Sequence, residues 1–398
     1  MDLAELTALL TPEGLRLVDE LGALDSTDDV AAAVSRLRSA GRAPELVAAA
    51  VGQARLRTRA RTKFGTFADR MLFTRSGLEQ ATRLEIAASH AGRFRDAGIR
   101  AVADLGCGIG GDALALAGIG LDVLAVDADE VTAALAAYNL APFGDAVRVR
   151  HARAQDVDLA GIDAVWLDPA RRTAGHGDTT RVSAGEWSPP LDWVWGLAAQ
   201  LPAGIKLGPA FDRSLVPADA GHVETQWISV DGATIELVVW TGVLARPGIR
   251  RAALVVRGGA AAELTADADA PDADVRALGE YLHEPEGAVI RARLIGDVAR
   301  TLGAGMIDEK IAYLTSDAPV SSPFVQSFRI REQLPNDVKA LARALRARGI
   351  GTLEIKKRGV DIDPATLRTK LKLRGSASAT LIVTRVGDRR LTLLADRL

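Results

Sequence analysis

The sequence predicts an α/β protein with a mainly parallel sheet in the middle of the chain, a helical segment before it and an α+β domain after it. Short apolar runs alternate with helical patterns across residues 64–258, and leucine and valine recur at helical spacing before residue 60. Strand-like runs flank another helical pattern after residue 324. Breaks between these patterns divide the 398 residues into expected domains 1–63, 64–258 and 276–398.

The first 60 residues are expected to form three or four short helices. Turn signals at Thr11-Pro12 and at Asp25–Asp28 separate their apolar patterns. A basic run then places a cation at every second position, at Arg55, Arg57, Arg59, Arg61 and Lys63. On an extended chain these cations would share one side, whereas on a helix they would spread around the axis. The run either flanks a nucleic-acid groove or is a solvated linker.

A strand, a glycine-rich turn and the start of a helix follow one another in Val102–Gly118. An apolar run reaches Asp104, and Gly106, Gly108 and Gly110 precede a helical pattern of Leu and Ala. This is the layout of a nucleotide-type cofactor site, in which glycines permit close approach of the ligand. The spacing also satisfies the dinucleotide pattern, and a purely structural turn is a further alternative.

Asp104 separates the two classes of cofactor. A helix N-terminus attracts the pyrophosphate of a dinucleotide, but a carboxylate two residues before the first glycine would repel that anion. S-adenosylmethionine (SAM) carries a sulfonium and an ammonium group, and both are attracted to a carboxylate. The charges at this turn therefore favour SAM, with Asp104 at its methionine amino end.

Two further acids follow later strands. Residues 121–126 read as a buried strand that ends at Asp127, a position that suits the ribose hydroxyl pair. The alternative is that Asp127 caps a helix that begins near Glu130. Asp156 follows a third expected strand at 147–149, where it either meets the adenine amino group or belongs to a surface loop.

The fourth expected strand, 164–167, runs into Asp168-Pro169 and then Arg171 and Arg172. Residues at the carboxyl ends of parallel strands lie over the ligand crevice. Asp168 is therefore expected to orient the acceptor, and Arg171 or Arg172 to stack on a base or clamp a phosphate. An Asx-Pro turn with solvated arginines is the structural alternative.

The remaining elements are expected from shorter signals. Residues 204–207 read as a strand, and runs 224–230 and 234–240 form a hairpin around Asp231-Gly232. The acidic, Ala-rich stretch 260–274 reads as a linker or an exposed hairpin tip. Residues 281–313 read as mixed helix and turn. Beyond them we expect strands at 324–331 and 351–357, a helix at 336–348 and a hairpin of 379–386 with 390–394.

The composition excludes several classes of protein. No apolar run is long enough to span a membrane, and no signal peptide is evident at the N-terminus. The lone Cys107 excludes an internal disulfide, which fits a cytoplasmic protein. The five histidines lack metal-ligand spacing, so no metal site is expected. No oligomeric state is predicted.

The charge is distributed unevenly along the chain. Residues 339–398 hold 15 Lys and Arg against 5 Asp and Glu, a net of +10, whereas the rest holds 34 against 46, a net of −12. A basic module on an acidic body favours a polyanionic partner such as RNA. A solvated basic surface without a partner is the alternative.

The motifs together resemble those of a class I SAM-dependent methyltransferase, whose fold is a Rossmann-like sheet. DLGCGIGGDALALA, VLAVDADE and WLDPARR resemble motifs of a trimethylguanosine-synthase-like core. TLEIKKRGVDIDP and RTKLKLRG resemble a C-terminal THUMP-like domain, which implies RNA binding. Residues 78–90 resemble the segment that approaches the cofactor in that family, which implies that Glu79 contributes to cofactor binding. The resemblance covers residues from about 60 to 398.

One motif departs from the family pattern. Nucleic-acid methyltransferases that act on amino groups carry Asp/Asn-Pro-Pro-aromatic at the fourth strand, and here Ala170 and Arg171 replace the last two residues. The resemblance therefore implies an enzyme that transfers a methyl group from SAM to a nucleophile, with RNA as the expected substrate. Two alternatives are a nucleic-acid-binding protein with a non-catalytic SAM-binding core and a methyltransferase of a small molecule or protein.

Overall fold

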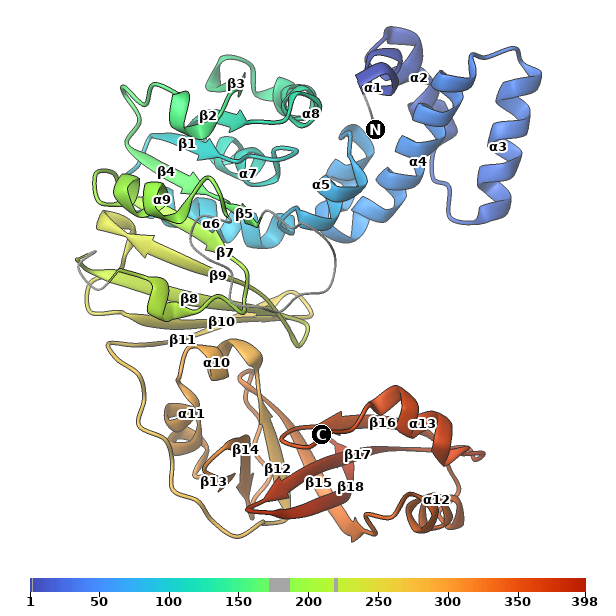
Figure 1. The fold of residues 1–398 in the computed structure, drawn as a ribbon, viewed down its shortest axis with the longest axis vertical. Helices are drawn as coiled ribbons and strands as arrows, with labels where there is room; N and C mark the ends of the chain where they lie inside the picture. The colour runs from blue at the N-terminus through green and yellow to red at the C-terminus, as the bar shows by residue number, and fades with distance from the viewer. Residues whose placement is uncertain (2, 172–186, 218–220) are drawn as a thin grey trace. The chain divides into compact units, whose positions relative to one another are not determined.

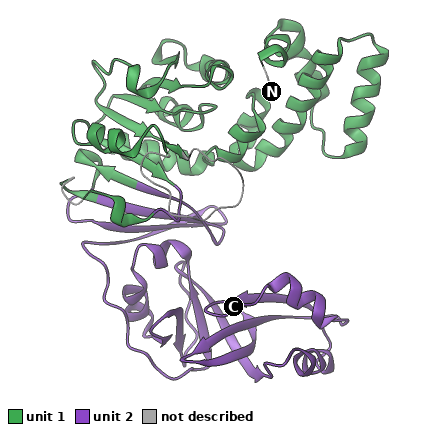
Figure 2. Ribbon diagram, viewed as in Figure 1, with its two compact units in different colours: residues 1–207, 212–223, 239–245 green, residues 208–211, 224–238, 246–398 purple. Residues whose placement is uncertain are grey.

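The computed structural model describes residues 1, 3–171, 187–217 and 221–398. The chain divides into two compact units, coloured separately in Figure 2. The first unit comprises Met1–Leu207, Asp212–Val223 and Val239–Ala245. The second comprises Gly208–Phe211, Glu224–Val238 and Arg246–Leu398. Among the described residues, no helix is both long enough and apolar enough to cross a membrane.

Four helices begin the first unit, which confirms the helical prediction: α1 (Leu3–Leu9), α2 (Pro12–Leu21), α3 (Thr27–Ser39) and α4 (Pro44–Phe64). Both predicted turns are helix N-caps. The Thr11 side chain accepts a hydrogen bond at the start of α2, and Ser26 forms a capping box with Asp29 at the start of α3. The apolar faces of the four helices share one core.

The basic run lies within α4, so its cations spread around the helix. Arg57 is buried and pairs with Asp19 at 2.7 Å, and Arg61 pairs with Asp69 at 2.9 Å. Lys63 is also engaged, because its ammonium group donates to backbone carbonyls of a later segment. The expected linker is therefore wrong, because the run is helical, and the expected nucleic-acid groove stays a prediction.

The described part of the first unit continues with helices and parallel strands (Figure 1). The helices are α5 (Arg75–Gln80), α6 (Leu84–Asp96), α7 (Gly111–Gly118), α8 (Glu130–Leu140) and α9 (Leu191–Ala198). The parallel strands are β1 (Ala101–Leu105), β2 (Asp122–Asp127), β3 (Val147–His151), β4 (Ala164–Leu167) and β7 (Ala203–Leu207). A separate small ribbon pairs β5 (Ala170–Arg171) with β6 (Trp187–Ser188).

The order of the parallel strands, β7-β4-β1-β2-β3, reverses next to β1. The chain adds β2 and β3 on one side of β1 and places β4 on the other side. In open α/β sheets, ligands bind beyond the carboxyl ends of the strands at such a reversal. Asp104 in β1 and Asp168 directly after β4 both lie at this end of the sheet, so the topology predicts a ligand site there.

The predicted hairpin around Asp231-Gly232 is confirmed as β8 (Val223–Val230) and β9 (Ala233–Thr241), which are neighbours in the sheet. Asp231 and Gly232 have φ values of 49° and 83°, as a two-residue hairpin turn requires. The full strand order is β11-β10-β8-β9-β7-β4-β1-β2-β3. It includes β10 (Arg251–Arg257) and β11 (Ala260–Ala266), which pair antiparallel. Of the two alternatives for 260–274, the linker is therefore wrong for the first half, which instead forms the exposed second strand of a hairpin.

A second sheet, of order β13-β14-β12-β15-β18-β17-β16, lies within the second unit. Its strands are β12 (Tyr281–Pro285), β13 (Gly305–Asp308), β14 (Ile311–Ser316), β15 (Val325–Leu334), β16 (Ile350–Lys357), β17 (Ala377–Val386) and β18 (Arg389–Arg397). Its helices are α10 (Gly287–Arg291), α11 (Ile295–Leu302), α12 (Val338–Ala347) and α13 (Pro364–Leu371). The last hairpin and α12 confirm their predictions, whereas 281–313 contains strands that were not expected.

Candidate active site

Asp104 is a buried carboxylate without a partner. Its residue is 1% exposed, and neither side-chain oxygen has a hydrogen-bond partner among the residues that the structure describes. Burial raises the pKa of Asp104 well above its ordinary value, and the charges of Asp112 and Asp168 raise it further. A buried carboxylate normally finds a donor or a cation. Asp104 is thus poised to bind a positively charged ligand, which fits the amino end of SAM.

An apolar layer lies beside Asp104, in the same row of the sheet. The strand register places Asp104 beside Trp166 on β4, and Trp166 beside Gly204 on β7. A Cβ on Gly204 would lie 2.7 Å from the rings of both Trp166 and Trp240, so only glycine fits there. Phe94 of α6 packs edge-on to both tryptophans. This layer closes the core at the row where the acidic side chains begin.

Four side chains that the sequence analysis did not single out join Asp168 in one hydrogen-bonded chain. The Lys206 ammonium lies 2.5 Å from Asp168 Oδ2 and 3.1 Å from Thr82 Oγ1. Thr82 donates to Asp112 Oδ2 at 2.9 Å, and Asp112 Oδ1 lies 3.2 Å from His90 Nδ1. With Asp104, these residues form what we call the strand-end cluster: Thr82, His90, Asp104, Asp112, Asp168 and Lys206.

The strand-end cluster carries more carboxylates than cations. Burial opposes ionisation of Asp112, but the hydrogen bond from His90 and the charge of Lys206 outweigh it and hold the pKa of Asp112 below its ordinary value. The lowered pKa keeps Asp112 anionic, the Asp168 carboxyl lies beside the single lysine of the cluster, and Asp104 adds a third acid. An excess of negative charge in a buried site favours a cationic ligand.

The glycine-rich turn is held by an acid of the neighbouring strand. Asp127 Oδ2 accepts from the Gly108 N–H at 3.0 Å, and its Oδ1 accepts from the Asp129 N–H at 2.9 Å. Burial raises the pKa of Asp127. Asp129, not Asp127, caps α8, so the capping alternative for Asp127 is wrong. Each oxygen of a carboxylate can accept more than one hydrogen bond, so Asp127 is still able to bind hydroxyl groups.

Gly106 shows why this turn needs glycine. Its φ is +97°, and a Cβ there would lie 3.2 Å from the backbone oxygen of Asp168. Gly108 and Gly110 also have positive φ values of 55° and 86°. The turn therefore brings the ends of β1 and β4 together, and with them two of the predicted site residues.

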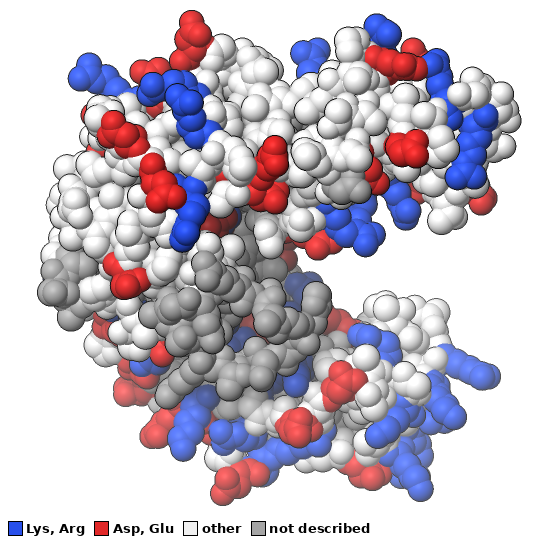
Figure 3. Space-filling model, turned by 45° about the horizontal axis from the view of Figure 1, so that its top comes forward, with Lys and Arg blue, Asp and Glu red and all other residues white. Residues whose placement is uncertain are grey.

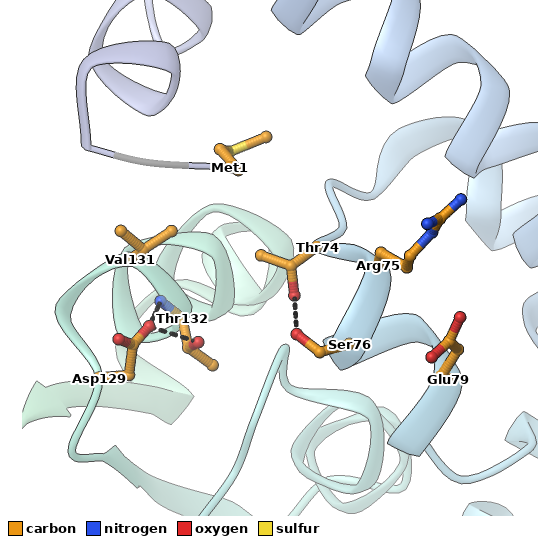
Figure 4. A pocket seen from close by; sticks show the side chains of 8 residues that line it. All are labelled: Met1, Thr74, Arg75, Ser76, Glu79, Asp129, Val131 and Thr132. Atoms are coloured by element: carbon orange, nitrogen blue, oxygen red, sulfur yellow. Dashed lines mark hydrogen bonds between the residues drawn. The ribbon is translucent and has the colours of Figure 1, made fainter. Parts of the chain in front are cut away.

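Glu79 lies on α5 at the edge of a hollow of about 520 Å³ (Figure 4). The start of α8 forms part of its lining, with Asp129 and Thr132. Because the Asp129 N–H donates to Asp127, this hollow adjoins the acid that holds the glycine turn. The expected contribution of Glu79 to cofactor binding stays a prediction.

The position of α5 depends on Lys63. The Lys63 ammonium donates to the carbonyl oxygens of Leu78 and Glu79 at 2.8 Å and of Ala81 at 2.7 Å. These carbonyls belong to the end of α5 and the turn after it, where a helix leaves acceptors unsatisfied. Lys63 thereby fixes the backbone that leads into Thr82 of the strand-end cluster.

The remaining predicted residues are less well joined to the cluster. Asp156 is exposed in a 3₁₀ turn after β3, and among the described residues no hydrogen bond or ion pair joins its side chain to the others. Arg171 is described only through its backbone, which pairs with Trp187. Arg172 lies outside the described residues. The roles expected for these three residues stay predictions.

Only one of the four residues that the sequence analysis did not single out had a recognisable signal in the sequence. Lys206 is the only charged residue of β7, and it lies in a run that is otherwise apolar or glycine. Thr82, His90 and Asp112 come from separate helices and turns, and only the tertiary fold brings them together. Among the residues that the structure describes, no group of three or more His, Cys, Asp or Glu side chains is arranged to hold a metal ion.

Comparison with known proteins shows two relatives along most of the chain. The "Uncharacterized S-adenosylmethionine-dependent methyltransferase" proteins MT3122 and Rv3037c, from two Mycobacterium tuberculosis strains, are each 34% identical over 358 residues. The match covers 88% of this chain and 95% of each relative. Residues 325–397 match the family described as THUMP domain-like, and residues 2–60 match a domain of unknown function (DUF8688).

One solved structure is similar over almost the whole chain. It is the "putative methyltransferase" of Porphyromonas gingivalis W83, with a TM-score of 0.70 and 20% sequence identity. The similarity covers 94% of this chain and 99% of that chain. At this identity the similarity shows a shared fold.

Proposed function

This chain belongs to the SAM-dependent methyltransferases, and from that premise we propose that it transfers the methyl group to RNA. The RNA proposal rests on the second unit, in which the residues that match the THUMP domain-like family overlap the basic segment 339–398. Figure 3 shows Lys and Arg side chains gathered over the part of this unit that contains α12 and α13. A surface of this kind favours a phosphate backbone.

A stripe on α12 carries the strongest part of this basic surface. Lys339, Arg343 and Arg346 are exposed, and none of them forms an ion pair with a described residue. Their spacing of four and three residues places them on one face of the helix, opposite the buried Leu341 and Leu345. We call these three residues the α12 stripe. Its charge is not neutralised within the described protein, so it is available to a polyanion.

The residues of the first unit bind the cofactor in this proposal. Bound SAM supplies an electrophilic methyl group on a sulfonium centre. Asp104 holds the positively charged methionine end, and Asp127 binds the ribose hydroxyls. Glu79 borders the cofactor from α5, and Asp156 faces the adenine amino group. The unpartnered carboxylate of Asp104 is the observation that supports this arrangement.

Asp168 orients the acceptor at the end of β4. An ionised carboxylate accepts a hydrogen bond from an N–H or O–H group, so this residue favours an acceptor that carries a proton, such as an exocyclic amine or a hydroxyl. As the acceptor atom forms its bond to the methyl carbon, the sulfur–methyl bond of SAM would break and leave S-adenosylhomocysteine. The acceptor would then lose its proton to water, and Asp168 would stabilise the positive charge that develops before this loss. Arg171 and Arg172 follow directly and are proposed to contact the base or a phosphate of the substrate.

Transfer of a radiolabelled methyl group tests the proposal directly. RNA is extracted from a strain that lacks this gene and is incubated with the protein and labelled SAM. We expect label in this RNA and little label in RNA from the parent strain, whose sites are already methylated. Label that enters only the protein or small-molecule fraction of the same extract would overturn the RNA substrate and leave methyl transfer intact.

Neutralising the α12 stripe is expected to weaken RNA binding. In the K339Q/R343Q/R346Q variant, affinity for unfractionated transfer RNA should fall about tenfold or more, because up to three phosphate contacts are lost. The slope of log affinity against log salt should decrease in magnitude by up to about 2–3 in the same titration, since each of three contacts contributes roughly 0.7–0.9.

The matched control removes three exposed arginines from the N-terminal helices, in an R16Q/R36Q/R38Q variant. This variant changes the net charge of the chain by the same amount. Its affinity and salt slope should stay close to those of the wild type. An equal loss in both variants would mean that overall charge, rather than the α12 stripe, determines RNA binding.

A further inference from the structure

Lys206 is the cation around which the strand-end cluster is built. Its ammonium lies 2.5 Å from Asp168 Oδ2, and its side chain is only 11% exposed. The same ammonium lies 3.1 Å from Thr82 Oγ1, whose hydroxyl donates to Asp112. One lysine thus joins the residue at the end of β4 to the first turn of α7.

The strand register explains why Lys206 reaches this position. Trp166 and Gly204 are partners on neighbouring strands, and Asp168 and Lys206 each follow two residues later. Side chains alternate along a strand, so residues two apart return to the same face. Lys206 therefore lies on the face that carries Asp104 and in the row above the tryptophan layer, where a buried charge needs a partner.

We propose that Lys206 is a positioning residue for methyl transfer, which holds the Asp168 carboxylate at the strand end and sets the negative charge that the cluster presents to SAM. This inference rests on the role proposed for Asp168. Lys206 acts through that carboxylate rather than on the reacting atoms. Without it, Asp168 and Asp104 would repel each other across the end of the sheet, and one of them would take up a proton.

The charges that face Asp104 support this assignment. The charge of Lys206 lowers the pKa of Asp104, whereas the charges of Asp112, Asp168 and Asp127 raise it. Among the described residues, the titratable and charged groups around the cluster are His90 on α6, Asp104 on β1, Cys107 after β1, Asp112 on α7, Asp127 on β2, Asp168 after β4, Lys206 on β7 and Lys63 on α4.

The test measures SAM affinity by calorimetry across a range of pH, in the wild type and in the K206M, K206R and D168N variants. Affinity should fall at low pH as Asp104 takes up a proton. In K206M the midpoint of this fall should move to higher pH by about one unit, because an opposite charge has been removed. In D168N the midpoint should move to lower pH, and in K206R it should equal the midpoint of the wild type.

Above the midpoint, K206M should bind SAM at least as tightly as the wild type, because its site is more negative. A packing role for Lys206 would instead weaken binding at every pH without moving the midpoint, and that result would overturn the proposal. Equal impairment of K206R and K206M would overturn it as well. The exposed Lys310→Met variant is the matched control and should follow the wild type.

These outcomes do not depend on the nature of the acceptor. If RNA is not the substrate, the wild type will leave RNA unlabelled, but its pH profile of SAM binding will still differ from that of K206M. Failure of the RNA proposal and failure of the role of Lys206 are therefore separate results.

Discussion

Replacing Asp104 with Asn is expected to reduce SAM affinity by about 100-fold or more while making the ligand-free protein more stable. The carboxylate is buried without a partner, so its charge costs free energy until a cation binds beside it. Asn has nearly the same shape but no charge, so it lacks the attraction to a cationic ligand that the carboxylate provides. A 100-fold loss corresponds to about 3 kcal/mol of binding free energy, within the range for an unpaired buried charge.

The gain in stability should depend on pH. Because the pKa of Asp104 is raised in the folded chain, the folded protein keeps a proton that the unfolded chain loses above a pH of about 3.9. Folding stability therefore falls as pH rises from this value through the folded pKa. The D104N variant lacks this pH dependence. Its free energy of unfolding should therefore exceed that of the wild type by about 1–3 kcal/mol at high pH and equal it in acid.

Calorimetry with SAM and thermal unfolding at several pH values would measure both effects in the same preparations. The exposed Asp122→Asn change at the start of β2 is the matched control and should alter neither quantity. If D104N binds SAM like the wild type, Asp104 is not the residue that receives the cationic end of the cofactor. A variant that loses affinity and stability together would point to damage of the fold instead.

Replacing Gly204 with Ala is expected to destabilise the first unit strongly. The added Cβ would lie 2.7 Å from the rings of Trp166 and Trp240, and both rings are almost fully buried. Overpacking of this kind typically costs about 1–3 kcal/mol, and more where neighbours cannot move. In a unit of this size, each kcal/mol lowers the melting temperature by about 2–4 °C.

The Gly208→Ala variant is the control, because a Cβ at that position meets no atom within 4 Å. Thermal unfolding should show a clear fall for G204A and little change for G208A. Because Lys206 lies between the two positions, G204A should also weaken SAM binding, which the same calorimetric assay measures. Equal melting temperatures for the two variants would show that the tryptophan layer tolerates a shift.

Local signals in the sequence predicted that Asp104, the glycine turn and Asp127 lie close together. Asp104, the glycine turn and Asp127 follow one another within one strand–turn–helix–strand unit, so their spacing alone places them together. The hairpin turn at Asp231-Gly232 was predicted for the same reason, since the required positive φ values select those residue types.

Features that depend on distant segments were not predictable in the same way. Lys206 meets Asp168 only because β7 pairs with β4, and Thr82 meets Asp112 only through the packing of α6 on α7. The strand β11 was missed because its acidic, Ala-rich composition is unfavourable for strands, and pairing with β10 overrides that local preference. The start of α13 had a readable signal, because Asp363 caps it and Pro364 follows.

The bonds from Lys63 to three carbonyls limit how this enzyme can be shortened or joined to another protein. Gln53 of the same helix exchanges two hydrogen bonds with the backbone of Phe73, so α4 grips the chain on both sides of α5. A fragment that begins at β1 would lack both Lys63 and Gln53. Helix α4 therefore serves as a scaffold for α5 and for the chain that leads into Thr82, and transplanting the sheet into another protein would have to bring α4 along with it.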